Sequence, residues 1–103
     1  MRYYVLGDEE TVTGFRLAGV HGEVAEAADA ARLRETFQRL VGNPNIGILI
    51  ITERLAEQLG ETLDNHRVRL STPLVVEVPD REGPLEGKRT LIEMITEAIG
   101  VRL

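Results

Sequence analysis

The sequence predicts an α/β fold: a small Rossmann-like, three-layer domain in which a four-stranded parallel sheet is flanked by helices, with a further helix at the C-terminal end. Strand-like and helical segments alternate along the chain, which is typical of a parallel sheet joined by right-handed crossovers. Residues 46–51 are apolar at every position except Gly47, so they favour an inner strand that helices cover on both sides. Asp8, Asp29 and Thr52 each stand where a side chain can cap a following helix.

The first elements are a strand, a helix and a weak second strand. Residues 3–6 are strand formers, and Gly7 breaks the run before a helix over residues 9–18. Gly19 ends this helix, and residues 20–24 form only a weak strand candidate because glycine and polar residues dilute it. The apolar side chains of the helix recur every three residues: Val12, Phe15 and Ala18.

Two more helices and a further strand complete the predicted core. The helix after Asp29 ends at Gly42 and carries one apolar stripe: Ala30, Leu33, Phe37, Leu40 and Val41. The shorter helix after Thr52 carries Leu55, Ala56 and Leu59, and Gly60 weakens its extension to Leu63. Residues 65–73 are expected to form a connection, and residues 74–78 a strand that Pro79 closes.

The C-terminal part is expected to be a loop rich in glycine, proline and charge, followed by a helix from about residue 89 to Gly100. The helix has an apolar stripe: Leu91, Ile92, Ile95, Ala98 and Ile99. The 103 residues are therefore expected to form one domain, with its core in residues 1–80 and its C-terminal loop and helix in residues 80–103.

The composition argues against several functional classes. The chain has no cysteine, which excludes a disulfide scaffold and a thiolate metal site. Its net charge of −5 opposes binding to nucleic acid or anionic lipid. No apolar run approaches the roughly 18 residues that cross a bilayer, and no secretory signal precedes the first strand. We therefore expect a cytoplasmic protein with no direct membrane insertion.

Two segments resemble ligand-binding motifs without completing them. Residues 83–88 lie between a strand and a helix, as a phosphate-binding loop does, but the glycines are too close together and Arg89 replaces the hydroxyl that holds magnesium. Asp8 and the two glutamates after it resemble the acidic pocket of receiver domains, yet the third strand lacks the phosphoryl-accepting Asp at its end. A helix cap is favoured for Asp8, and a receiver-like regulatory domain without a functional phosphoacceptor is the alternative interpretation.

No catalytic, cofactor or metal site is predicted. His21 and His66 are far apart in the sequence, without the spacing of a metal pair. Arg67 and Arg69 have no interleaved aromatic residues, so a solvated edge or a contact with an acidic partner is expected there.

Two features favour a binding module over an enzyme. Gly14 and Gly19 flank Arg16 and Leu17, which point away from the apolar stripe of the first helix. A neighbouring chain could therefore approach closely, although tight packing on the chain's own sheet explains the glycines equally well. The C-terminal helix follows a loop long enough to let it dock elsewhere, and docking on the core is the simpler arrangement.

Several segments of the chain resemble the F subunit of the V/A-type rotary ATPases of archaea and bacteria. The most specific is residues 6–20, Leu-Gly-Asp-Glu-Glu-Thr-Val-Thr-Gly-Phe-Arg-Leu-Ala-Gly-Val. The further matches follow in family order and extend the resemblance over almost the whole chain: residues 47–53, 73–79, 83–84 and 98–101.

The resemblance implies a non-catalytic central-stalk subunit of a proton- or sodium-translocating ATPase or ATP synthase. Such a subunit binds the coiled coil of the D subunit and turns with it inside the catalytic head that the A and B subunits form. It supports coupling between ATP turnover and ion transport, needs no cofactor, and lies in the cytoplasm, peripheral to the membrane. The family fold is a small Rossmann-like domain whose C-terminal segment is associated with regulation and with contact to the catalytic head.

The expected partner contacts fall in two places. Arg16 and Leu17 belong to the matching motif, and Arg16 is expected to meet acidic groups on the partner. The outward positions of the last helix supply the others: Arg89, Glu93 and Met94.

Overall fold

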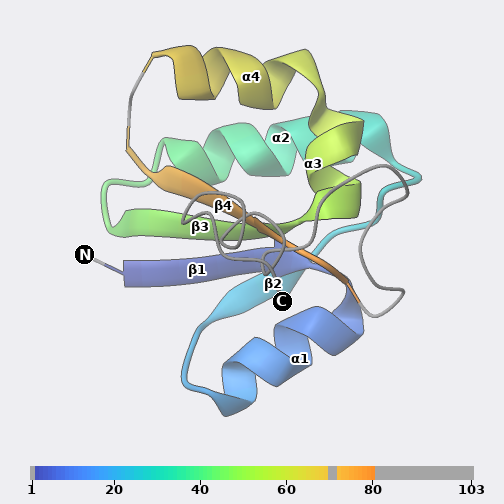
Figure 1. Cartoon of the computed structure of the whole chain (residues 1–103), viewed down its shortest axis with the longest axis vertical. Helices are drawn as coiled ribbons and strands as arrows, with labels where there is room; N and C mark the ends of the chain where they lie inside the picture. Colours follow the sequence, from blue (N-terminus) through green and yellow to red (C-terminus); the bar gives the residue numbers. More distant parts are fainter. Residues whose placement is uncertain (1, 70–71, 81–103) are drawn as a thin grey trace, which may run out of the picture.

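A four-stranded parallel sheet in the order β2-β1-β3-β4 lies at the centre of the computed structural model, which describes residues 2–69 and 72–80 (Figure 1). The strands are β1 (Arg2–Gly7), β2 (Gly22–Val24), β3 (Ile46–Thr52) and β4 (Leu74–Val78). The weak strand expected over residues 20–24 is real but short, and it pairs with β1 through Val5 and Gly22. The predicted α/β class with a parallel sheet is therefore confirmed.

Three of the four described helices begin where a side chain accepts from a free backbone N–H group of the first turn. They are α1 (Glu9–Leu17), α2 (Ala30–Val41), α3 (Glu53–Leu59) and α4 (Glu61–Val68). The Asp8 carboxylate accepts from the Thr11 N–H of α1, and the Asp29 carboxylate from the Arg32 N–H of α2. The Thr52 hydroxyl accepts from the Leu55 N–H of α3. All three predicted caps are confirmed; α4, which begins directly after Gly60, has no side-chain cap.

Two predictions around Gly60 need correction. The third helix ends at Leu59, because Gly60 adopts φ +52°, a left-handed conformation that breaks the helical hydrogen bonds. A separate helix, α4, then runs to Val68, so the connection expected over residues 65–73 was wrong in its first half. The C-terminal loop and helix expected over residues 80–103 lie outside the described residues from residue 81 onward.

The described helices divide unequally between the two faces of the sheet (Figure 1). Right-handed crossovers explain the division, because the step from β1 to β2 runs one way across the sheet and the later steps toward β4 run the other way. Consequently α1 is the only one of the four described helices on its face, and the other face carries α2, α3 and α4. The main buried cluster lies between those three helices and the sheet: Leu6, Leu33, Phe37, Leu40, Ile46, Leu49, Ile51, Leu55, Ala56, Leu59, Leu63 and Val75.

Candidate partner-binding surfaces

The C-terminal end of α1 presents the two partner-contact residues that were predicted within the described part of the chain. Leu17 is 86% exposed, a large value for an apolar side chain in the last turn of a helix. Arg16 is also exposed, and its guanidinium donates a long hydrogen bond of 3.5 Å to the Gly22 carbonyl of β2. A Cβ at Gly14 would meet nothing within 4 Å, so this glycine is not explained by packing within the described chain. The surface around Leu17 is open to a neighbour.

A second exposed apolar surface lies on the sheet face that α1 covers only in part. The strand register aligns Tyr3 of β1 with Ile48 of β3 and Leu74 of β4. Two residues further along β3 and β4, it aligns Ile50 with Val76. Because alternate side chains of a strand share a face, these residues form one surface, which we call the open sheet face: Tyr3, Ile48, Ile50, Leu74 and Val76. Leu74 is 63% exposed and Val76 40% exposed, and both isoleucines are half-buried.

Within the described residues, β3 has helices on one side only, whereas its sequence predicted helices on both sides. Residues 46–51 were expected to be covered by helices on both sides, yet in the described part of the chain α1 contacts mainly β1 and β2. Val5 on β1 and Val12 on α1 are buried there, whereas Ile48 and Ile50 on β3 retain solvent exposure.

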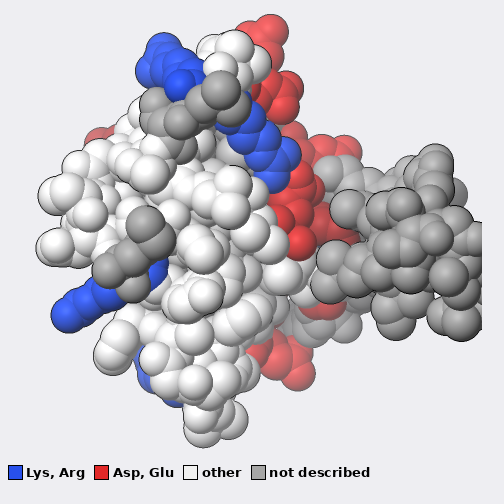
Figure 2. Space-filling model, turned by 60° about the vertical axis from the view of Figure 1, so that its left-hand side comes forward, with Lys and Arg blue, Asp and Glu red and all other residues white. Residues whose placement is uncertain are grey.

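Figure 2 brings forward the side of the molecule that holds the amino-terminal ends of the strands. This side is mostly white: arginine side chains stand around its rim, and acidic side chains gather toward one side of it. Tyr3 and Leu74 lie at the beginnings of their strands. Since α1 runs back across the sheet from β1 to β2, its end at Leu17 also lies near this side. A surface with few charged side chains is typical of the centre of a protein–protein interface.

At each edge strand of the sheet, an arginine side chain donates a hydrogen bond to a backbone carbonyl group of that strand. Arg16 contacts Gly22 on β2, as described above, and Arg67 donates to the Val75 carbonyl of β4 at 3.3 Å. Arg67 also pairs with the Glu77 carboxylate at 2.9 Å. Charged side chains at an edge strand discourage pairing with another chain. The basic cluster at residues 67–69 therefore includes a residue that protects the edge of β4.

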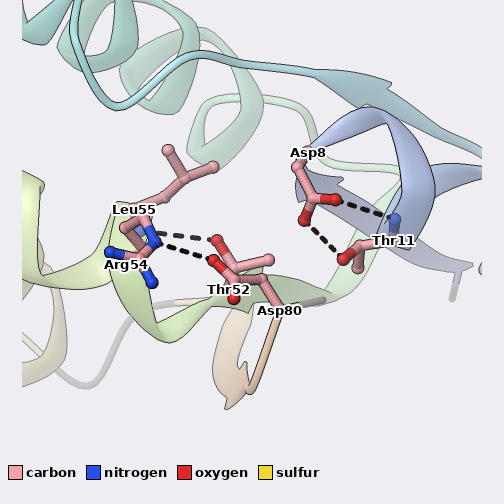
Figure 3. A network of polar contacts seen from close by, with 6 residues as sticks. All are labelled: Asp8, Thr11, Thr52, Arg54, Leu55 and Asp80. Atoms are coloured by element: carbon pink, nitrogen blue, oxygen red, sulfur yellow. Dashed lines mark hydrogen bonds and ion pairs between the residues drawn. The ribbon is translucent and has the colours of Figure 1, made fainter. Parts of the chain in front are cut away.

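The carboxyl-terminal ends of the strands form a small cavity of about 230 Å³, bordered by Asp8, Thr52, Arg54 and Asp80 (Figure 3). Ligands commonly bind at this end of a parallel sheet. Here the polar groups hold the fold together: Asp8 and Thr52 cap helices, Asp8 also accepts from the Thr11 hydroxyl, and Arg54 pairs with Asp80 at 2.8 Å. The cap interpretation of Asp8 is confirmed.

The remaining candidates from the sequence are the two histidines, a metal site and the C-terminal segments. His66 lies edge-on to Phe37, and its Nε2 lies 2.8 Å from the Pro73 carbonyl oxygen, whereas His21 is exposed. Within residues 2–69 and 72–80 no cluster of His, Asp and Glu is arranged to hold a metal ion. The glycine-rich segment 83–88 and the predicted contact residues of the last helix lie outside the described residues: Arg89, Glu93 and Met94.

One polar network was not foreseen. The Tyr4 hydroxyl donates to Glu23 Oε1 at 3.0 Å, and Arg39 donates to Glu23 Oε2 at 2.6 Å, so the network joins β1, β2 and α2. Burial raises the pKa of Tyr4, and the Glu23 carboxylate that accepts from its hydroxyl raises this pKa further. Tyr4 is 19 positions from Glu23 in the sequence, and Arg39 is 16 positions from it. A short sequence pattern therefore does not predict these contacts.

No helix in the described part of the chain is long and apolar enough to cross a membrane.

Comparison with known proteins identifies the family. Residues 4–95 match the family model of the ATP synthase (F/14-kDa) subunit. The F subunit of the A-type ATP synthase of Thermococcus kodakarensis is 42% identical over 106 aligned positions, which cover 100% of this chain and 98% of the relative. The corresponding F subunit of Methanocaldococcus jannaschii is 39% identical, with 100% and 99% covered.

A solved structure supports the fold. The F subunit of the V-type ATP synthase of Archaeoglobus fulgidus superposes with a TM-score of 0.61 at 21% identity, covering 75% of this chain and 95% of that one. At this identity the match establishes the fold, and the family assignment comes from the sequence matches. These sequence matches favour the F-subunit family over the receiver-like alternative. The chain also has no acceptor Asp at the end of the third strand, because β3 ends at Thr52 and α3 begins at Glu53. The chain belongs to the F-subunit family of the A/V-type ATP synthases.

Proposed function

We propose that this chain is a non-catalytic central-stalk subunit of a rotary, ion-translocating ATPase or ATP synthase, and that it binds the coiled-coil D subunit and turns with it. The match to the F-subunit family over residues 4–95 carries this proposal. The exposed Leu17 at the end of α1 supports it, since a rotor subunit without an active site must act through its surfaces. The polar groups at the carboxyl end of the sheet also support it, because they cap helices and pair with each other.

The end of α1 is the proposed contact with the D subunit. Leu17 offers an apolar side chain for the groove of a coiled coil, and Arg16 beside it offers a charge for an acidic side chain of the partner. The last helix contributes its outward residues to the same assembly: Arg89, Glu93 and Met94. The assembled protein lies in the cytoplasm, peripheral to the membrane and next to the catalytic A and B subunits.

Affinity purification of the tagged chain from its own cells tests the assignment. At modest salt, we expect the D, A and B subunits to be recovered with it in near-stoichiometric amounts. Their absence, from cells shown to contain the ATPase, would contradict the proposal.

Variants of α1 test the surface. We expect Leu17→Asp to weaken binding to the purified D subunit by roughly 30-fold, about 2 kcal/mol, because it places an unpaired charge in an apolar contact. Arg16→Glu should weaken it less, and the weakening should diminish at high salt. Val68→Asp is the matched control, since Val68 is 80% exposed at the end of α4 on the opposite side of the sheet. Equal affinity of the Leu17 variant and the control would exclude this surface.

A further inference from the structure

Gly14 lies inside α1, where a glycine destabilises a helix relative to alanine because it loses more backbone freedom on folding. The described glycines with a positive φ are Gly19 and Gly60, so Gly14 has a backbone conformation that any residue can adopt. In the described part of the chain, a Cβ at Gly14 would meet nothing within 4 Å, whereas a Cβ at Gly22 would collide with the Val5 side chain. The described fold therefore does not require a glycine at position 14.

The outward face of α1 has the residue spacing of a hole in helix–helix packing. Val12 on the inner side of α1 is 1% exposed, and the outer side carries four exposed residues at positions i, i+3, i+4 and i+7: Glu10, Thr13, Gly14 and Leu17. In knobs-into-holes packing, a side chain of one helix enters a hole that four such residues of the facing helix form. Because Gly14 has no side chain, this hole, which we call the α1 hole, reaches down to the backbone.

The surroundings of the α1 hole favour an apolar side chain with an acidic residue beside it. Leu17, which is 86% exposed, supplies an apolar wall. Among residues 11–20, Arg16 has the only charged side chain, and its hydrogen bond to the Gly22 carbonyl is long, at 3.5 Å. A bond of this length holds the guanidinium weakly, so Arg16 can turn toward a carboxylate of a partner. The charge at this end of α1 is thus positive, although the whole chain has a net charge of −5.

We propose that the α1 hole receives one large apolar side chain from the outer surface of the D-subunit coiled coil, and that Gly14 sets how closely the partner helix approaches. This assignment rests on the proposed function, which supplies the D subunit as the partner. A helix fits because the walls of the hole have the spacing that accepts the side-chain ridges of another helix. An acidic residue near the inserted side chain pairs with Arg16 and fixes the register of the two helices.

Enlarging Gly14 tests the proposal, because it separates binding from stability. In the full-length chain, Gly14→Ala and Gly14→Leu each place a better helix former where the described chain leaves space. The thermal unfolding temperature should therefore stay the same or rise. Leucine fills the hole, and we expect it to weaken binding to the purified D subunit by about 10- to 100-fold, as overpacking does in a core. Gly14→Ala should weaken binding by less than about tenfold.

Ala31→Leu is the matched control, because Ala31 is a small, exposed residue of α2 on the opposite face of the sheet. Titration calorimetry should give this variant the affinity of the unsubstituted chain. An unchanged affinity of Gly14→Leu would overturn the α1 hole and leave binding to the D subunit intact. A lower unfolding temperature of Gly14→Ala would show that the glycine serves the fold, which also contradicts the proposal. Failure of the unsubstituted chain to bind the D subunit would overturn the proposed function as well.

Shortening the partner's side chain is the reciprocal test. Each exposed apolar residue of the D-subunit coiled coil is replaced by alanine, and each variant is titrated with the unsubstituted chain and with Gly14→Leu. We expect one position at which alanine weakens binding to the unsubstituted chain but strengthens binding to Gly14→Leu, because the shorter side chain makes room for leucine. The absence of such a reversal would show that no single side chain of the D subunit occupies the hole.

Sedimentation of the isolated chain distinguishes a different occupant. A monomer that Gly14→Leu leaves unchanged is expected. A dimer that Gly14→Leu dissociates would assign the α1 hole to a second copy of this chain and would overturn the proposal.

Discussion

The two faces of the sheet differ in how they are covered, although the strands supply apolar side chains to both. Val75 and Val76 show this most directly, since they are neighbours of the same residue type in β4. Val75 lies under the helices at 7% exposure, and Val76 lies on the open sheet face at 40%. The crossovers from β2 to β3 and from β3 to β4 place all their helices on one face. Topology therefore decides which apolar side chains form the core and which remain to bind something else.

The largest expected effect comes from placing a charge on each face in turn. Val75→Asp buries a carboxylate among apolar side chains, and we expect it to reduce the free energy of unfolding by about 3 kcal/mol or more. Val76→Asp should reduce it by about 1 kcal/mol or less, because Val76 keeps 40% of its surface exposed. Urea denaturation of both variants measures the difference. Equal losses would mean that the two faces are equally buried.

Truncation of the largest core side chain measures the strength of the covered face. Phe37 is fully buried between α2 and the sheet and touches the His66 ring. We expect Phe37→Ala to cost about 3–4 kcal/mol, because the cavity cannot close completely. Tyr3→Ala on the open sheet face should cost about 1 kcal/mol or less. A small effect of Phe37→Ala in thermal denaturation would show that the helices pack loosely on this face.

The caps of α2 and α1 give a comparison of intermediate size, one on each face. Asp29→Ala removes the side-chain acceptor for the Arg32 N–H, and we expect a loss of about 1 kcal/mol. Asp8→Ala removes the bonds to both the N–H and the hydroxyl of Thr11, so its loss should be larger. The corresponding asparagine variants retain an acceptor and serve as controls. Thermal denaturation would refute the cap roles if alanine and asparagine behaved alike at both sites.

The smallest expected effect concerns the network that joins β1 and β2 to α2. The raised pKa of Tyr4 means that the folded state favours the protonated hydroxyl. Its contribution is complete below the ordinary pKa of 10.0 and is lost as the pH rises through the raised value. We expect Tyr4→Phe to cost about 1 kcal/mol or less at neutral pH and to flatten the decline of stability above about pH 10. An unchanged alkaline decline in urea titrations would show that Tyr4 does not cause it.

Local chemistry explains why much of the fold could be predicted. Asp8, Asp29 and Thr52 cap their helices through bonds that span only three residues, so residue type and position suffice. Gly60 was recognised as a weak point, but a single glycine does not tell whether the chain stops or begins a new helix. The φ of +52° and the following α4 settle that question in the structure.

Long-range arrangement explains what the sequence did not reveal. The contacts among Tyr4, Glu23 and Arg39 depend on how α2 lies against the sheet, which no short pattern encodes. The apolar run of β3 indicated an inner strand correctly, but hydrophobicity does not say which element covers it. For the candidate surfaces, the motif around Leu17 made it a predicted contact residue, and the structure shows that it is exposed. The open sheet face became visible only when the register of three strands was known.

The central claim is that the end of α1 contacts the coiled coil of the D subunit, and residue-specific cross-linking tests it most directly. A Leu17→Cys variant of the cysteine-free chain carries a photoreactive maleimide, is assembled with the D, A and B subunits, and is irradiated. Mass spectrometry then identifies the linked chain. We predict a cross-link to the D subunit from Leu17→Cys and none from Val68→Cys. Cross-links to the A or B subunits alone, or equal linking to the D subunit from both positions, would contradict the account.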